Sequence, residues 1–324
     1  MNLIKEIALK IFPFEEYVDC KCNAQHEICL QCNKCRAMLE DQIITDFTDL
    51  SPLIDHTNLR ADANHDDIIN LCEEANEHNF RCVCINPCYI NLAKKKIKSS
   101  DICSVVGFPL GANIPETKIF ETERAIDMGT NEIDMVLNIA GLKLNSKIVK
   151  EYDIAPLHVS TKFQSTLTSQ NSSTKSSPST SSKKEDQLKK QTVDLVEKSN
   201  TSLPYITKKI NEWASEIALI ASICNNRGVI LKVIIETCLL TNEDIILACL
   251  AIKKAGADFV KTSTGFSTHG AEIEKVQLIR AIVGTKMGVK ASGGIKTKDA
   301  AISMLKAGAN RIGSSCSVQL IMEN

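Results

Sequence analysis

Short apolar runs alternate along the chain with longer segments in which apolar residues recur every three or four positions. A near-continuous apolar run such as "KVIIET" is typical of a parallel strand covered on both faces. Eight runs fit β-strands, at residues 53–59, 81–87, 103–109, 132–139, 230–237, 259–264, 288–294 and 311–316.

The segments between these runs have the periodicity and the start and stop signals of helices. The helix expected over 115–129 opens with Pro115 and ends before Gly129. Thr at the N-cap and Gly just past the end mark two more helices, at 241–256 and 297–308. Apolar periodicity predicts the remaining two helices, at 64–79 and 207–228.

Eight strands separated by helices predict an α/β fold, specifically a (β/α)₈ TIM barrel. An open doubly wound sheet is the alternative. It is weakened because no G-x-G-x-x-G follows the first strand, where a dinucleotide-binding fold would carry it.

One segment breaks the alternation. Residues 160–183 contain 15 Ser or Thr among 24 positions and have no apolar period. Such a segment cannot bury enough surface to offset its ordering entropy, so residues 155–203 are expected to be disordered. The insert follows strand four, on the catalytic face of a barrel. It is either a tolerated surface insertion or a lid, modification or docking segment.

The insert divides the chain into four parts: an N-terminal extension (1–45), the first half of the barrel (46–154), the insert (155–203) and the second half (204–324). The extension opens with apolar residues at helical spacing, which predict a docking helix or, alternatively, a helix on a membrane surface. These residues are Leu3, Ile4, Ile7, Ala8 and Ile11.

Composition is that of an ordinary globular protein, with 324 residues, 44% hydrophobic and 24% charged. The net charge of −1 gives no indication of a nucleic-acid or membrane partner. No apolar run reaches the roughly 18 residues that span a bilayer. Lys5, Glu6 and Lys10 interrupt the apolar N-terminus, which argues against a signal peptide and for a cytoplasmic protein.

The chain contains 14 cysteines, which without a secretory signal are expected to be reduced. Five of them have the spacing C-x-C-x₆-C-x₂-C-x₂-C, with His26 nearby. Two C-x₂-C steps resemble the spacing of zinc ligands, so a structural zinc site is one hypothesis. The alternatives are reduced thiols without metal, or a redox role. The cluster consists of Cys20, Cys22, Cys29, Cys32 and Cys35.

Three predicted strands carry an ionisable residue among apolar neighbours, namely Asp134, Lys261 and Lys290. Each lies near the C-terminal end of its strand, where barrel active sites are found. Only about one lysine in 2,500 is uncharged at pH 7, and burial beside a second cation lowers the pKa of an amine. Lys261 near Lys290 fits that arrangement, and Asp134 would transfer protons.

These residues also have less specific interpretations. Lys261 alone would most often point to solvent, and Asp134 with Lys290 would form a simple ion pair. The three together favour a Schiff-base aldolase, which needs no cofactor for catalysis.

Glycines and serines after the last three strands predict a phosphate site, since barrels commonly hold phosphate in the loops after strands seven and eight. They are Gly265, Gly293, Gly294, Gly313, Ser314 and Ser315.

The chain resembles deoxyribose-phosphate aldolase over about residues 50–145 and 205–318. The resemblance is carried by "LIDHTNL", "VCINP", "VVGFPLGAN", "EIDMVLNI", "LKVIIETCLLT", "VKTSTGFST", "VKASGGI" and "RIGSS". It implies an imine on Lys261, a pKa-lowering role for Lys290 and proton transfer by Asp134. Further residues implied near the sugar are Asp55, Thr57, Cys84 and Lys232.

The reaction implied is the reversible cleavage of 2-deoxy-D-ribose 5-phosphate to glyceraldehyde 3-phosphate and acetaldehyde, in deoxynucleoside catabolism. The partner is a phosphorylated sugar, and assembly as a homodimer or a homotetramer stays open. The insert, the first 45 residues and His269-Gly270 depart from the family pattern. The rival hypotheses are another Schiff-base barrel aldolase, a transaldolase, and a non-catalytic barrel that serves as a scaffold.

Overall fold

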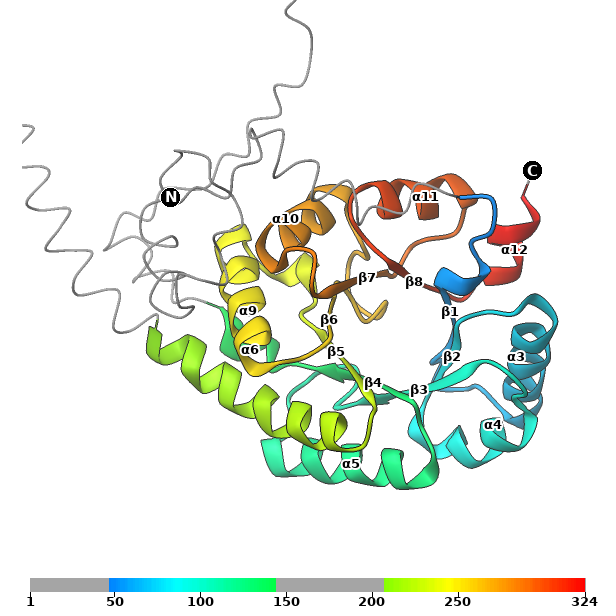
Figure 1. The fold of residues 1–324 in the computed structure, drawn as a ribbon, viewed down its shortest axis with the longest axis horizontal. Helices are drawn as coiled ribbons and strands as arrows, with labels where there is room; N and C mark the ends of the chain where they lie inside the picture. Colours follow the sequence, from blue (N-terminus) through cyan, green and yellow to red (C-terminus); the bar gives the residue numbers. More distant parts are fainter. Residues whose placement is uncertain (1–46, 144–206, 324) are drawn as a thin grey trace, which may run out of the picture.

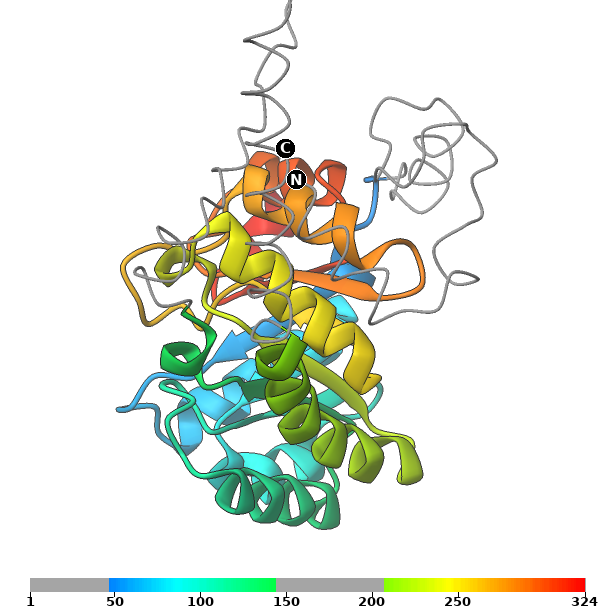
Figure 2. The same ribbon diagram turned by 90° about the vertical axis from the view of Figure 1, so that its left-hand side faces the viewer.

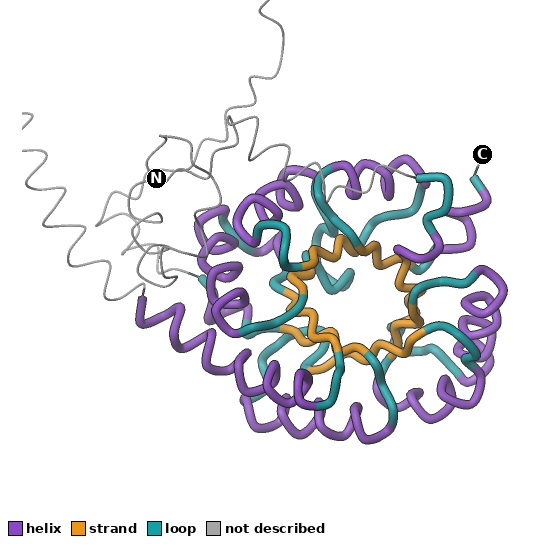
Figure 3. Tube along the Cα trace, in the orientation of Figure 1, coloured by secondary structure: helices purple, strands orange, loops and turns teal. Residues whose placement is uncertain are grey.

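The computed structural model describes residues 47–143 and 207–323. Eight parallel strands form a closed barrel in the order β1 to β8, surrounded by helices (Figures 1 and 3). The strands are β1 (Ile54–Asn58), β2 (Cys82–Ile85), β3 (Asp101–Val106), β4 (Glu132–Val136), β5 (Ile230–Ile234), β6 (Phe259–Lys261), β7 (Gly288–Ser292) and β8 (Arg311–Ser314).

The (β/α)₈ prediction is therefore confirmed, and the alternative of an open sheet is wrong because β1 pairs with both β2 and β8. Most of the predicted strands run too far at their C-terminal ends. Residues such as Thr262, Ser263 and Thr264 follow β6 and are buried, but they belong to a loop. The predicted strands were too long because residues at the mouth of the barrel are buried like strand residues, although they lie beyond the hydrogen-bonded ladder.

The expected helices are present with their predicted caps. Thr241 accepts a hydrogen bond from the Asp244 backbone N–H at the start of α9, and Gly256 ends that helix in the left-handed conformation. Thr297 caps α11 in the same way. The helices are α3 (His65–His78), α4 (Ile90–Lys96), α5 (Pro115–Met128), α6 (Ile139–Leu142), α9 (Asn242–Ala255), α10 (Ile273–Val283), α11 (Lys298–Lys306) and α12 (Ser317–Met322), with 3₁₀ turns η2 (Ser51–Leu53), η3 (Pro87–Tyr89) and η4 (Thr237–Leu239).

A further helix over residues 207–226 precedes β5 and lies between α5 and α9 (Figures 1 and 2). The buried Lys118 of α5 pairs with Glu216 of this helix at 2.7 Å. On the other side, Lys254 of α9 donates a hydrogen bond to Asn211 at 2.8 Å. The first of these contacts places the second half of the chain directly against the first.

The apolar core lies between the outer face of the barrel and the helices. Val83, Ile133, Val233, Val260 and Val289 are fully buried there, and they alternate along their strands with residues that face the barrel interior. The interior, by contrast, is strongly polar. None of the helices within residues 47–143 and 207–323 combines the length and apolar character needed to cross a membrane.

Three predictions concern residues outside those that the structure describes. They are the N-terminal helix, the cysteine cluster at 20–35 with its zinc hypothesis, and the disordered insert at 155–203.

Candidate active site

Seven charged side chains from six strands meet inside the barrel and form what we call the interior ionic network. Four are cations and three are carboxylates, and all are buried. Because the parallel strands close into a ring, alternate residues of strands that are distant in sequence point at one another. The members are Asp55, Glu132, Asp134, Lys232, Lys261, Lys290 and Arg311.

Asp134 of β4 is the centre of this network. Its Oδ2 lies 2.7 Å from Nζ of Lys261 and 2.8 Å from Nζ of Lys290. Its Oδ1 lies 2.8 Å from Nζ of Lys232. One carboxylate thus contacts three ammonium groups, and Lys261 and Lys290 share a single oxygen atom of it.

Asp55 and Glu132 form the lower part of the network. Asp55 lies 2.5 Å from Lys290 and 2.7 Å from Arg311. Glu132 lies 2.6 Å from Lys232 and 3.0 Å from Arg311. Every carboxylate therefore bridges at least two cations, which is how a protein interior tolerates charges that would be costly alone.

The burial of these groups and their mutual attraction act in opposite directions. Burial alone would raise the pKa of Asp134, but the charges of Lys232, Lys261 and Lys290 outweigh it and hold that pKa well below its ordinary value. Burial alone would lower the pKa of Lys290, but Asp134 and Asp55 raise it well above the usual range. Asp134 is therefore a carboxylate and Lys290 a cation at neutral pH.

Three cysteines, Cys82, Cys84 and Cys103, line the side of the barrel next to the network. Burial would raise the pKa of Cys103, yet hydrogen bonds from the other two thiols lower it to about 5. Its Sγ lies 3.4 Å from Nζ of Lys232. Cys84 is 3.8 Å from Asp134.

These thiols and the carboxylates offer two sets of metal-type ligands in the described chain, Cys82/Cys103/Glu132 and Cys84/Cys103/Asp134. The Lys232 ammonium group already lies within 3.4 Å of Glu132, Asp134 and Cys103, and it supplies the positive charge that a metal would bring. A metal would have to displace this lysine. The sets are also distinct from the cysteines of the zinc hypothesis, which stays a hypothesis.

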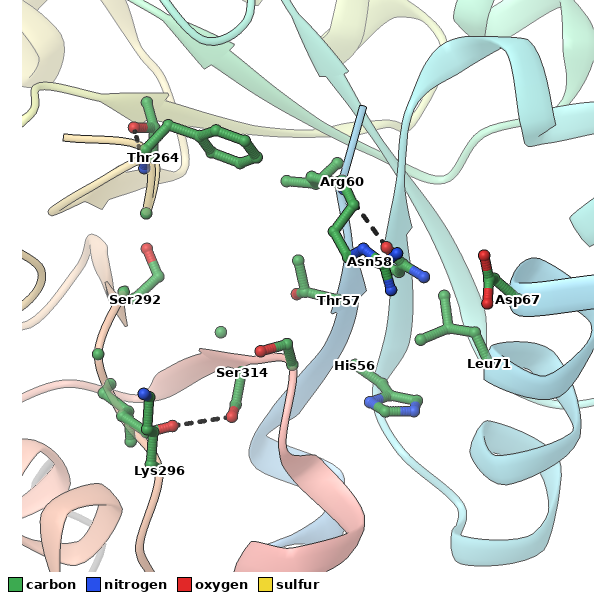
Figure 4. Close-up of a pocket in the computed structure, with 18 of the residues that line it drawn as sticks. His56, Thr57, Asn58, Arg60, Asp67, Leu71, Thr264, Ser292, Lys296 and Ser314 are labelled. Atoms are coloured by element: carbon green, nitrogen blue, oxygen red, sulfur yellow. Dashed lines mark hydrogen bonds between the residues drawn. The ribbon is translucent and has the colours of Figure 1, made fainter. Parts of the chain in front are cut away.

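A cavity of about 510 Å³ opens above the network at the C-terminal ends of β1, β6, β7 and β8. Lys261 lines it with its side chain only 3% exposed. Figure 4 shows Thr57, Thr264, Ser292 and Ser314 around the cavity, with Lys296 beside Ser314. The side chain of Lys261 is thus reachable from the cavity but shielded from bulk water.

All the residues predicted to bind phosphate line this one cavity: Gly265, Gly293, Gly294, Gly313, Ser314 and Ser315. Gly313 has a second reason to be glycine. A Cβ there would lie 3.0 Å from Cε of Lys290 and 2.9 Å from Cβ of Ser292, so a side chain would crowd the lysine.

The other predicted substrate residues divide into two groups. Thr57 lines the cavity. Asp55, Cys84 and Lys232 are fully buried beneath it and do not line it, so their predicted contact with the sugar stays a prediction. His269 is exposed, as expected for a tolerated departure from the family pattern.

Sequence reasoning missed four residues that belong here: Glu132, Arg311, Cys103 and Lys296. Glu132 precedes Asp134 by two positions, so both face the same side of β4, and this spacing is the signal that could have revealed it. Lys296 follows the Gly293-Gly294 pair and brings a positive charge to the part of the cavity where phosphate is predicted to bind.

Comparison with known proteins gives a consistent result. The sequence profile of the DeoC/LacD family aldolases matches residues 51–152 and 201–317. A deoxyribose-phosphate aldolase of Caldanaerobacter subterraneus subsp. tengcongensis is 39% identical over 276 residues, which cover 85% of this chain and 93% of that protein. Deoxyribose-phosphate aldolase 1 of Vibrio vulnificus is 41% identical over 270 residues, covering 83% and 94%.

The fold has solved counterparts as well. The tetrameric deoxyribose phosphate aldolase of Aeropyrum pernix matches with a TM-score of 0.62 at 26% identity, covering 88% of this chain and 96% of that one. A putative deoxyribose-phosphate aldolase from Coccidioides immitis also has a TM-score of 0.62, at 26% identity and with 91% and 98% coverage.

Barrel, buried amines and relatives together define an aldolase, an enzyme of the lyase class. The profile match spans well over half of the chain, and the relatives match nearly their whole length. The chain belongs to the DeoC/LacD family of aldolases, which confirms the resemblance predicted from its motifs.

Proposed function

We propose that this chain is a class I aldolase that reversibly cleaves 2-deoxy-D-ribose 5-phosphate to D-glyceraldehyde 3-phosphate and acetaldehyde, in the catabolism of deoxyribonucleosides. The observation that carries the proposal is the shared Asp134 oxygen between Lys261 and Lys290, directly below a cavity lined by Lys261. Relatives named deoxyribose-phosphate aldolase at about 40% identity support the choice of substrate.

Lys261 acts as the nucleophile. After the Lys261 ammonium group gives a proton to Asp134, its neutral amine attacks C1 of the open-chain sugar, and loss of water gives an iminium ion on Nζ. Removal of the proton from the C3 hydroxyl breaks the C2–C3 bond, and the bonding electrons move into the iminium to form an enamine. Glyceraldehyde 3-phosphate leaves. Protonation of the enamine at C2 and hydrolysis then release acetaldehyde and the free lysine.

Asp134 moves the protons in these steps. It is ionised, its Oδ2 is 2.7 Å from the attacking nitrogen, and it can both accept and return a proton. Lys290 remains charged against the same oxygen and supplies the neighbouring cation that reactive amines of this kind require.

Phosphate binding is proposed for the loops of Gly293-Gly294 and Ser314-Ser315, which line the cavity. Their backbone N–H groups are the proposed donors to the phosphate, and Lys296 adds positive charge. The Aeropyrum pernix relative is described as tetrameric, and assembly of this chain as a dimer or tetramer stays a prediction.

The test is borohydride trapping together with turnover on deoxyribose 5-phosphate. The wild-type chain is expected to cleave the sugar phosphate and to form a reduced, covalent adduct at Lys261. In Lys261→Met the adduct should disappear and turnover should fall by on the order of 10³-fold or more, with the fold intact. Lys254→Met, which removes an exposed lysine from α9, is the matched control and should behave as wild type.

Other outcomes separate the rival functions. Trapping and turnover with a different sugar phosphate in preference to deoxyribose 5-phosphate would indicate another Schiff-base aldolase or a transaldolase. Failure to trap any carbonyl compound would indicate a barrel that serves only as a scaffold.

A further inference from the structure

Glu236, two residues after the end of β5, has an unusual backbone conformation. Its φ of 53° and ψ of 65° lie in the left-handed region, which is costly for a residue with a long side chain. The residue is also buried, with 2% of its surface exposed. A conformation of this kind persists only where the surroundings enforce it, and such residues gather at functional sites.

The conformation turns the Glu236 carboxylate toward the loop after β6. The backbone N–H of Thr264 lies 3.3 Å from both carboxylate oxygens, and the Thr264 hydroxyl donates a short hydrogen bond to Oε2. The backbone joins the same two loops, because the N–H of Thr237 donates a hydrogen bond to the carbonyl of Thr262 at 2.9 Å. Glu236 thus holds the β6 loop by a charged side chain.

The loop that Glu236 holds forms one wall of the cavity. Thr264, Gly265 and Phe266 line it together with Lys261. The Thr264 hydroxyl also accepts a hydrogen bond from the N–H of Phe266 at 3.1 Å, and the Phe266 ring packs edge-on against Phe108 with 5.3 Å between centroids. A chain of contacts therefore runs from the Glu236 carboxylate to the mouth of the pocket.

We propose that Glu236 is a positioning residue, whose carboxylate fixes the loop 263–266 over Lys261 so that Thr264 is presented to the bound sugar. The role rests on the proposed function. Glu236 does not line the cavity, so it acts through Thr264. The strained backbone of Glu236 serves to position the loop and does not stabilise the barrel.

Glu236→Gly separates these two effects, because glycine removes the carboxylate and also relieves the left-handed conformation. We expect the melting temperature to stay equal or rise, while KM for deoxyribose 5-phosphate rises about tenfold or more. Borohydride trapping at saturating substrate should persist. Glu236→Gln retains one carbonyl oxygen for Thr264 and should restore most of the affinity.

Asn79→Gly is the matched control. Asn79 is the other non-glycine residue with positive φ in the described chain, at 54°, and it ends α3 away from the cavity. Its variant should keep wild-type KM. The inference is overturned if Glu236→Gly has wild-type kinetics, or if activity of both Glu236 variants falls only in step with their melting temperatures. A wild-type chain that does not cleave the sugar phosphate would instead refute the proposed function.

Discussion

Replacing Asp134 with Asn removes one negative charge from the centre of the interior ionic network and keeps the shape of the side chain. The wild-type network has four cations against three carboxylates, and the variant has four against two. Lys261 is the most affected cation, since Asp134 is its one ion-pair partner among the described residues.

The size of the effect follows from burial. Removing one partner from a buried ion pair costs about 3–5 kcal/mol, because the remaining charge loses its compensation. That is a large part of the roughly 5–15 kcal/mol that stabilises a typical domain. With an m-value of about 3 kcal/mol per M in urea, the unfolding midpoint should fall by roughly 1–2 M.

The pH dependence adds an independent signature. In wild type, Asp134 raises the pKa of Lys232 and of Lys290 in the folded state. These raised pKa values contribute stability that is present at neutral pH and is lost as the pH rises above the unfolded lysine pKa of about 10.4. The variant lacks the part of this contribution that Asp134 provides, so its free energy of unfolding should fall less steeply than that of wild type between about pH 9 and 11.

The assay is urea unfolding at several pH values, with Asp127→Asn as control. Asp127 makes the same kind of contact, 3.0 Å from Arg227, but both side chains are about half exposed, so its loss should cost at most about 1 kcal/mol. An Asp134→Asn variant as stable as this control would refute the reasoning. It would mean that the three lysines do not depend on Asp134.

Two further predictions concern neighbouring residues. Gly313→Ala should crowd Lys290, lower the free energy of unfolding by about 1–3 kcal/mol and reduce turnover. Gly141→Ala is the control, since a methyl group there meets only ordinary contacts, and it should change neither stability nor turnover. Equal activity of the two variants would contradict the role given to Gly313. Burial lowers the pKa of His56 despite its hydrogen bond to Glu74, so His56 contributes stability above its unfolded pKa of about 6.5 and loses it as the pH falls. The free energy of unfolding should decrease between pH 7 and 5, less so in His56→Gln, and parallel curves for the two proteins would exclude this role.

The fold could be predicted because its signals are local. Apolar runs, helix caps such as Thr241 and terminal glycines each specify one element, and a count of eight β units predicts closure. The approach of Lys261, Lys290 and Asp134 to one another follows from closure as well, since all three lie near the same ends of their strands. Their chemical roles stay predictions.

The rest of the site depends on contacts that leave no local mark. Arg311 pairs with Asp55, 256 positions away, and each looks alone like a charge at a strand end. The proposed role of Glu236 could not be predicted for another reason. It depends on a left-handed backbone conformation, which neither hydropathy nor residue spacing reveals. Strand ends were misjudged where the polar residues after β6 are buried, as core residues would be.

The pairing of β4 with β5 joins the two halves of the barrel along a direct seam, from Glu132 beside Ile230 to Val136 beside Ile234. A second seam lies between β8 and β1. The interior ionic network straddles both, with Asp55 and Asp134 coming from one half and all three lysines from the other. Because backbone pairing crosses both seams, the geometry at the centre is fixed by contacts between the two halves.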